Sequence, residues 1–171
     1  MSLSPFSHSP RSRSVRVGSI VTFLGCAALV LGAVSCESDL RESFYRSLLD
    51  ARTDGGIDRG WVPDILPESA HDIHEIHEIS GGRTWCAFDF SRADWEGFRT
   101  NLTRSAVAPM NSIAAPRVSW WPAILTGRID PDRLRNAGLE LFAVARPLNS
   151  EVLLFAIDLA RTRGYFYRVP R

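Results

Sequence analysis

Three histidines recur at three-residue intervals in one short segment, and they are the side chains best suited to chemistry in this chain. His71, His74 and His77 are each followed directly by an acidic residue. Imidazole and carboxylate groups together bind zinc, nickel or copper in proteins. One interpretation of the segment is therefore a periplasmic metal-binding or metal-sensing module.

The spacing of the histidines limits that interpretation. In a strand, residues three apart lie on opposite faces, so only His71 and His77 share a face, about 20 Å apart. In a helix, histidines at i and i+3 form a pair but a poor three-ligand site. Zinc hydrolases of the HExxH type need two histidines four apart, and no two here have that spacing. The competing interpretation is a polar strand face without a ligand.

Tryptophans form the second group of candidates, because five are many for a chain of 171 residues. Exposed tryptophans stack on glycan or contact a partner, whereas buried ones fill a core. Trp95 lies at helical spacing with Phe98, which predicts a core position. Trp61, Trp120 and Trp121 are the candidates for a binding surface.

Motifs typical of enzymes are missing from the sequence. There is no G-x-S-x-G elbow, no glycine-rich phosphate loop and no CxxC pair. Nothing in the sequence brings two carboxylates together for glycan hydrolysis. These observations predict a protein that is not an enzyme and has no cofactor.

The N-terminal 36 residues have the layout of a bacterial export signal. Arg11, Arg13 and Arg16 precede an uncharged apolar stretch over 18–34, which is followed by Cys36. Three outcomes remain open. The chain is cleaved before Cys36 and lipidated there, or it is cleaved after Ser35 and released, or the stretch stays as a membrane anchor. Each outcome places the remainder outside the cytoplasm, in the cell envelope and facing the periplasm.

The remaining region, residues 37–171, is long enough for a single domain. Subtracting the three leader arginines from 20 basic residues leaves 17, against 19 acidic residues, a net charge of −2. This balance argues against nucleic acid, whose binding proteins present a basic face. Cys86 lies in an apolar run, which predicts a buried, unreactive thiol.

The pattern of apolar residues predicts an α+β domain: a small antiparallel sheet, made of a hairpin and a meander, with helices packed on one face. The hairpin is expected over 72–79 and 84–90. Helices are expected over 39–52 and from Ser91 to 102, with short helical turns near 120–125 and 130–138. The meander is expected over 139–145, 151–159 and 165–169, and a loop over 103–117.

Three segments resemble a family of uncharacterised bacterial lipoproteins of the YbbD-head-like type. They are 51–73, which contains Gly60-Trp61-Val62-Pro63; the hairpin with Trp85 and Phe88-Asp89-Phe90; and Phe155-Ala156-Ile157-Asp158 with Gly164-Tyr165-Phe166-Tyr167. Such proteins usually carry Asp-x-Asp-Thr-Asn in the hairpin turn, where this chain has His77-Glu78-Ile79-Ser80-Gly81-Gly82. The resemblance implies a lipoprotein without a known activity, and it assigns no catalytic residue.

The sequence thus predicts a membrane-tethered envelope protein that acts as a non-enzymatic interaction or structural module. Its membrane contact is expected through lipid on Cys36 or through the apolar stretch. A protein or a glycan of the envelope is the expected partner. The alternative function is metal binding by the 71–77 segment.

Overall fold

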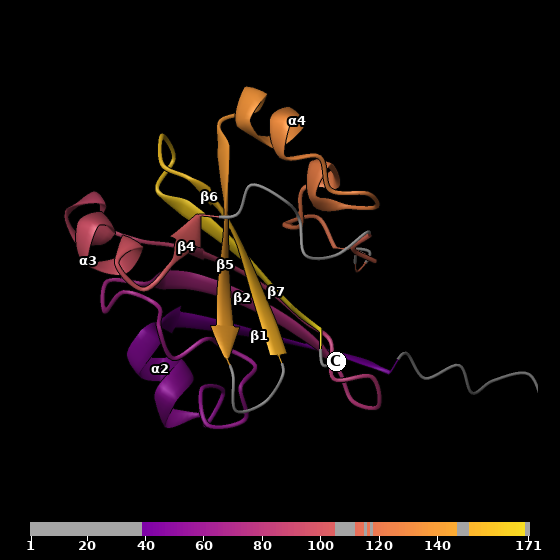
Figure 1. Ribbon diagram of the computed structural model, residues 1–171. Coiled ribbons are helices and arrows are strands. Elements are labelled where there is room, and N and C mark those ends of the chain that lie inside the picture. The colour runs from indigo at the N-terminus through magenta and orange to yellow at the C-terminus, as the bar shows by residue number, and fades with distance from the viewer. Residues whose placement is uncertain (1–38, 105–111, 115, 117, 147–150, 170–171) are drawn as a thin grey trace, which may run out of the picture. The chain divides into compact units, whose positions relative to one another are not determined.

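The described residues build a seven-stranded antiparallel sheet with the strand order β1-β2-β3-β7-β6-β5-β4 (Figure 1). The computed structural model describes residues 39–104, 112–114, 116, 118–146 and 151–169. The strands are β1 (Leu40–Ser47), β2 (His71–Glu78), β3 (Thr84–Asp89), β4 (Thr103–Arg104), β5 (Leu139–Arg146), β6 (Glu151–Asp158) and β7 (Arg163–Val169). Because β4 has only two residues, six longer strands form nearly the whole sheet.

Helical elements are few and short, so the domain is mostly β-structure. The α-helices are α2 (Leu48–Thr53), α3 (Trp95–Arg99) and α4 (Pro131–Asn136), and the 3₁₀ helices are η2 (Arg92–Asp94) and η3 (Ala123–Leu125). We call the side of the sheet that packs against α2, α3 and residues 54–70 the α2 face. The other side, which packs against η3, α4 and the neighbouring described residues, is the α4 face.

Strand periodicity explains why the sheet carries two hydrophobic cores. Successive side chains of a strand point to opposite faces. On β3, Trp85 therefore joins the core of the α4 face, while Cys86 and Phe88 join that of the α2 face. The central strands β6 and β7 alternate in the same way, for example at Phe166 and Tyr167. Both faces of the central strands are thus buried.

The segment predicted as a helix over 39–52 is the main correction. Its first eight structured residues form strand β1, and only Leu48–Thr53 are helical. Apolar residues spaced by three and four fit a helix, but backbone pairing with β2 along the whole of β1 decides the outcome. Ser47 ends the strand: its hydroxyl accepts a hydrogen bond from the Asp50 backbone N–H at 3.2 Å, which caps α2.

The other predicted elements were mostly found. The hairpin is β2 and β3, the meander is β5, β6 and β7, and Ser91 caps the helical turn that precedes α3. The prediction that helices pack on one face only is wrong, because Leu48 of α2 and Leu134 of α4 belong to different cores. Trp95 and Cys86 are buried as predicted. The leader and its boundary at residue 36 lie outside the described residues.

Candidate functional site

The three histidines of β2 lie in three separate environments, so the structure does not bring them together. His77 packs against Trp61 on the α2 face, and His74 packs against Phe44 and Trp120 on the α4 face. This separation follows from strand alternation, as the sequence predicts for neighbouring histidines. The alternation breaks before His74, because the β2–β3 register shifts between His71 and His74.

His77 is part of a buried stack. Its ring lies 3.9 Å from that of Trp61, measured between centroids, with only 11° between the planes. The Arg59 guanidinium lies over the same tryptophan, with Cζ 4.6 Å from the ring centroid. Gly60, directly before Trp61, has a φ of +72°, a left-handed backbone conformation that favours glycine. The Trp61 ring therefore contacts His77 and Arg59 rather than standing free.

Glu75 lies beneath this stack and is fully buried. His77 Nδ1 lies 3.0 Å from Glu75 Oε1, and Glu75 Oε2 has no hydrogen-bond partner among the described residues. Burial raises the pKa of Glu75 to about 8, against the opposing effects of the Ser43 hydroxyl and the Arg168 charge. Burial also lowers the pKa of His77, and the positive charges of Arg168, Arg59 and Arg41 lower it further.

Both groups are therefore mainly neutral at pH 7, and we assign the hydrogen bond accordingly. The protonated Glu75 carboxyl donates to Nδ1 of neutral His77. Perturbed pKa values often mark catalytic sites, but such groups must reach a substrate. Only 7% of His77 and none of Glu75 is exposed. This pair suits a closed, pH-dependent packing element better than a reaction centre.

On the opposite face, His74 belongs to an open cluster that we call the aromatic surface: Phe44, His74 and Trp120. The His74 centroid lies 4.9 Å from that of Phe44 and 5.7 Å from that of Trp120. Trp120 Nε1 donates to Glu42 Oε1 at 2.7 Å, which fixes the indole beside β1. Phe44 is 51% exposed, which is unusual for a phenylalanine. The aromatic surface thus presents apolar rings to solvent at the edge of the sheet.

Trp121 is not part of that surface. It is buried, and it packs edge-to-face against Trp120 and against Tyr165 of β7. The prediction that Trp121 lines a binding surface is therefore wrong. The two rings do diverge, since the planes of Trp120 and Trp121 lie at 79° to each other. Trp120, the half-buried member of the pair, is the one that reaches the surface.

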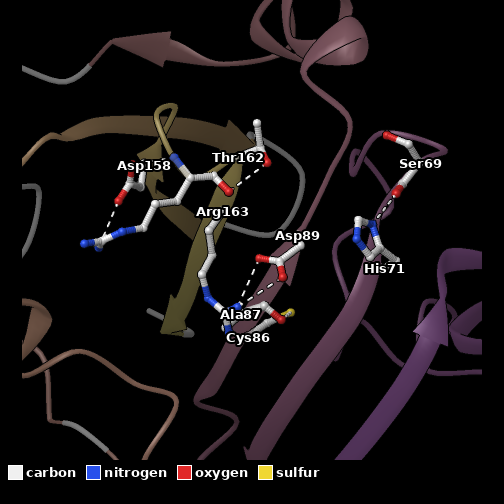
Figure 2. A network of polar contacts seen from close by, with 9 residues as sticks. Ser69, His71, Cys86, Ala87, Asp89, Asp158, Thr162 and Arg163 are labelled. Carbon is white, nitrogen blue, oxygen red and sulfur yellow. Dashed lines mark hydrogen bonds and ion pairs between the residues drawn. The ribbon is translucent and has the colours of Figure 1, made fainter.

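His71 lies near two carboxylates at the start of β2. Ligand atoms of His71, Asp72 and Asp89 all lie within 4.8 Å of one another. His71 Nδ1 lies 3.0 Å from the carbonyl oxygen of Ser69, and Asp89 lies on the neighbouring strand β3 (Figure 2). That bond leaves Nε2 of His71 for a metal. Asp89, however, also forms an ion pair with Arg163, at 3.0 Å (Figure 2).

Sequence reasoning did not single out the remaining members of these clusters. The apolar spacing over 39–52 predicts a helix for Phe44, and the histidine pattern makes Glu75 only one of three interleaved acids. A usable signal for Glu75 existed: it stands two residues from Ile73, on the apolar face of a predicted strand. Cys36, the predicted lipidation site, lies outside the described residues.

No helix among the described residues is both long enough and apolar enough to cross a membrane.

The fold defined by these elements is an antiparallel sheet with a buried core on each face. Residues 39–89, which span β1, α2, β2 and β3, match the family model of the YbbD head domain. This match confirms the YbbD-head-like resemblance over those residues, and β4 to β7 lie beyond it. It suggests an envelope-associated protein of unknown role. No curated protein and no solved structure matches the chain.

Proposed function

We propose that this chain is a membrane-tethered envelope protein whose folded body is a non-enzymatic interaction module. The observation that carries this proposal is the aromatic surface, where Phe44 is 51% exposed beside His74 and Trp120. Aromatic side chains are enriched at the centres of protein interfaces, where burying their rings supplies most of the affinity. The proposed partner is a protein or a glycan of the envelope.

The non-enzymatic part of the proposal is supported by the state of the carboxylates. Glu75 is shielded from solvent, as described above. Glu68, Asp89 and Glu96 each form an ion pair with an arginine: Arg52, Arg163 and Arg99, respectively. Each of these carboxylates thus contacts an arginine of the same domain, and acid–base work on a substrate would have to break that contact.

The interaction is tested by photo-crosslinking in intact cells. A photo-reactive phenylalanine analogue replaces Phe44, and in the control it replaces Glu96, an exposed residue of α3 on the α2 face. The proposal predicts a product of defined mass from position 44, and a weaker or absent one from position 96. Trp120→Ala should reduce the product from position 44. Equal products from both positions, or none from position 44, would contradict the proposal.

The tether rests on the export-type leader and is tested separately. In cells that express the full chain, labelling with a radioactive fatty acid should mark the protein, and Cys36→Ser should abolish the label. Cys26→Ser is the matched control, because Cys26 lies within the apolar stretch and should leave the label unchanged. A chain that carries no lipid and fractionates as a soluble cytosolic protein would contradict the tether.

A second candidate function is metal binding, which the His71, Asp72 and Asp89 group favours over the three-histidine site. Equimolar zinc should then raise the melting temperature of the full chain. His71→Ala should remove this shift, whereas His74→Ala, on the aromatic surface, should leave it unchanged. A melting temperature that does not respond to zinc would exclude this candidate.

A further inference from the structure

We propose that a second copy of this chain adds to β1, antiparallel, in the register that places the two Phe44 residues opposite each other. The inference rests on the proposed function, because it names the partner of the aromatic surface. It concerns the free edge of the sheet and the side chains that flank it.

Strand β1 forms one edge of the sheet in the described part of the chain. Among the described residues, β1 pairs with β2 on one side and with no strand on the other. It has eight residues, whereas β4, at the opposite edge, has two. A strand at an edge presents a row of backbone N–H and C=O groups that another strand can pair with. β1 is thus the longer template for such pairing.

The alternation of backbone hydrogen bonds along β1 shows which of its residues face that edge. The Ile79 N–H donates to the Asp39 carbonyl at 2.9 Å, and the β1–β2 register continues this pairing through Arg41↔His77. In an antiparallel pair, alternate residues exchange these bonds. Odd-numbered residues of β1 therefore bond to β2, and Glu42, Phe44 and Arg46 direct their backbone groups outward.

Residues whose backbone groups point outward in one copy must lie opposite residues of the same kind in the other copy. This requirement limits the registers that a symmetric dimer can adopt. Centring the pair on Phe44 places Glu42 of each copy opposite Arg46 of the other. Centring it on Glu42 or on Arg46 places like charges opposite each other, which is unfavourable. Centring it on Ser43 or Tyr45 places Phe44 opposite a charged residue. Only the Phe44-centred register satisfies both charges.

The side chains fit this register. Glu42, Phe44 and Arg46 alternate along the strand and so share the α4 face. Opposed residues in a hydrogen-bonded antiparallel pair have Cα atoms about 5.5 Å apart, so the two Phe44 rings come into contact. Arg46 is exposed and has no ion-pair partner among the described residues. The second copy supplies one, while Glu42 Oε1 keeps its bond from Trp120.

A charge-reversal cycle on the full chain tests this inference. The chain is solubilised in detergent micelles, and its mass is measured by sedimentation velocity over a range of protein concentrations. We expect a monomer–dimer equilibrium. Glu42→Arg and Arg46→Glu should each weaken it about tenfold or more, because each places two like-charged pairs across the interface. The double variant E42R/R46E should restore the dimer to within about threefold, because opposite charges face each other again.

A control variant separates the β1 edge from general effects of charge. Glu96→Arg changes a charge on α3 and should leave dimerisation unchanged. A monomer at every concentration, or a dimer that neither single reversal weakens, would overturn the inference. A monomer that still forms the Phe44 crosslink to a different protein would overturn it and leave the proposed function standing.

Discussion

Two histidines of one strand show how differently the two faces of this sheet are used. His77 stacks on Trp61 above a buried carboxyl group, and 7% of its surface is exposed. His74, three residues earlier, packs beside another tryptophan, Trp120, but next to the half-exposed Phe44. A histidine beside a tryptophan is thus buried on the α2 face, whereas on the α4 face it lies in a cluster that is open to solvent.

The difference comes from what covers each face near β1. On the α2 face, residues 54–70 bring Trp61 and apolar residues such as Val62 and Leu66 over the first two strands. On the α4 face, the described chain reaches β1 mainly through Trp120 and its bond to Glu42. The α2 face near β1 is therefore covered and contributes to stability, whereas the aromatic surface stays open.

Replacing the two tryptophans should give the largest contrast. Trp61→Ala removes the ring between His77 and Arg59 and opens the site of Glu75 to water. We expect a loss of about 2–4 kcal/mol in the free energy of unfolding, measured by urea denaturation. Trp120→Ala should cost about 1 kcal/mol, because its ring covers no buried ionisable group. Equal losses for both variants would contradict the distinction between the faces.

The buried pair on the α2 face should also make the stability of the chain depend on pH. The pKa of Glu75 is raised to about 8 in the folded chain, so between 4.5 and 8 the folded state retains a proton that the unfolded state has lost. The free energy of unfolding then falls as pH rises, by about 1.4 kcal/mol per pH unit. The lowered pKa of His77 acts in the opposite direction below 6.5 and offsets this fall there.

The net loss of stability is therefore expected between about pH 6.5 and 8. Glu75→Gln keeps the shape of the side chain and a hydrogen-bond donor but cannot ionise, so its stability should stay level over that range. Urea denaturation at several pH values measures both curves, and Glu68→Gln, an exposed carboxylate, is the control. A wild-type curve that is flat from pH 6.5 to 8 would show that Glu75 is not held protonated.

The smallest effect on stability is expected at the aromatic surface itself. Phe44→Ser removes an exposed ring and should change the free energy of unfolding by no more than about 0.5 kcal/mol. Self-association, measured by sedimentation velocity, should nevertheless be lost. Leu49→Ser, at an exposed residue of α2, is a matched control that should affect neither property. If Phe44→Ser unfolds the chain, Phe44 belongs to the core.

Much of the fold could be predicted because local patterns determined it. β3 and the strands of the β5–β7 meander are runs of apolar residues divided by turns, and they were found, whereas β2 was predicted as the hairpin partner of β3. β1 could not be predicted in the same way. Leu40, Phe44 and Leu48 have the spacing of a helix, and only pairing with β2 makes the segment a strand. The covering of both faces likewise depends on where distant segments pack.

The candidate site could be predicted only where the alternation of side chains along a single strand determined it. Alternation along β2 correctly separates His74 from His77. The partner of His77 is Trp61, 16 residues upstream, and that of His74 is Trp120, 46 residues downstream, and no local pattern places these rings. Trp121 was misassigned for the same reason: its environment is set by Tyr165 on β7.

Amide hydrogen exchange along β1, followed by NMR on the full chain in detergent, shows whether a second copy closes the edge of the sheet. The backbone N–H of Ser43 should be protected at every protein concentration, because it bonds to β2. The N–H of Phe44, which faces the open edge, should exchange rapidly in dilute protein and slowly when the chain is concentrated. Rapid exchange at Phe44 under all concentrations, with Ser43 still protected, would show that no second copy closes the edge.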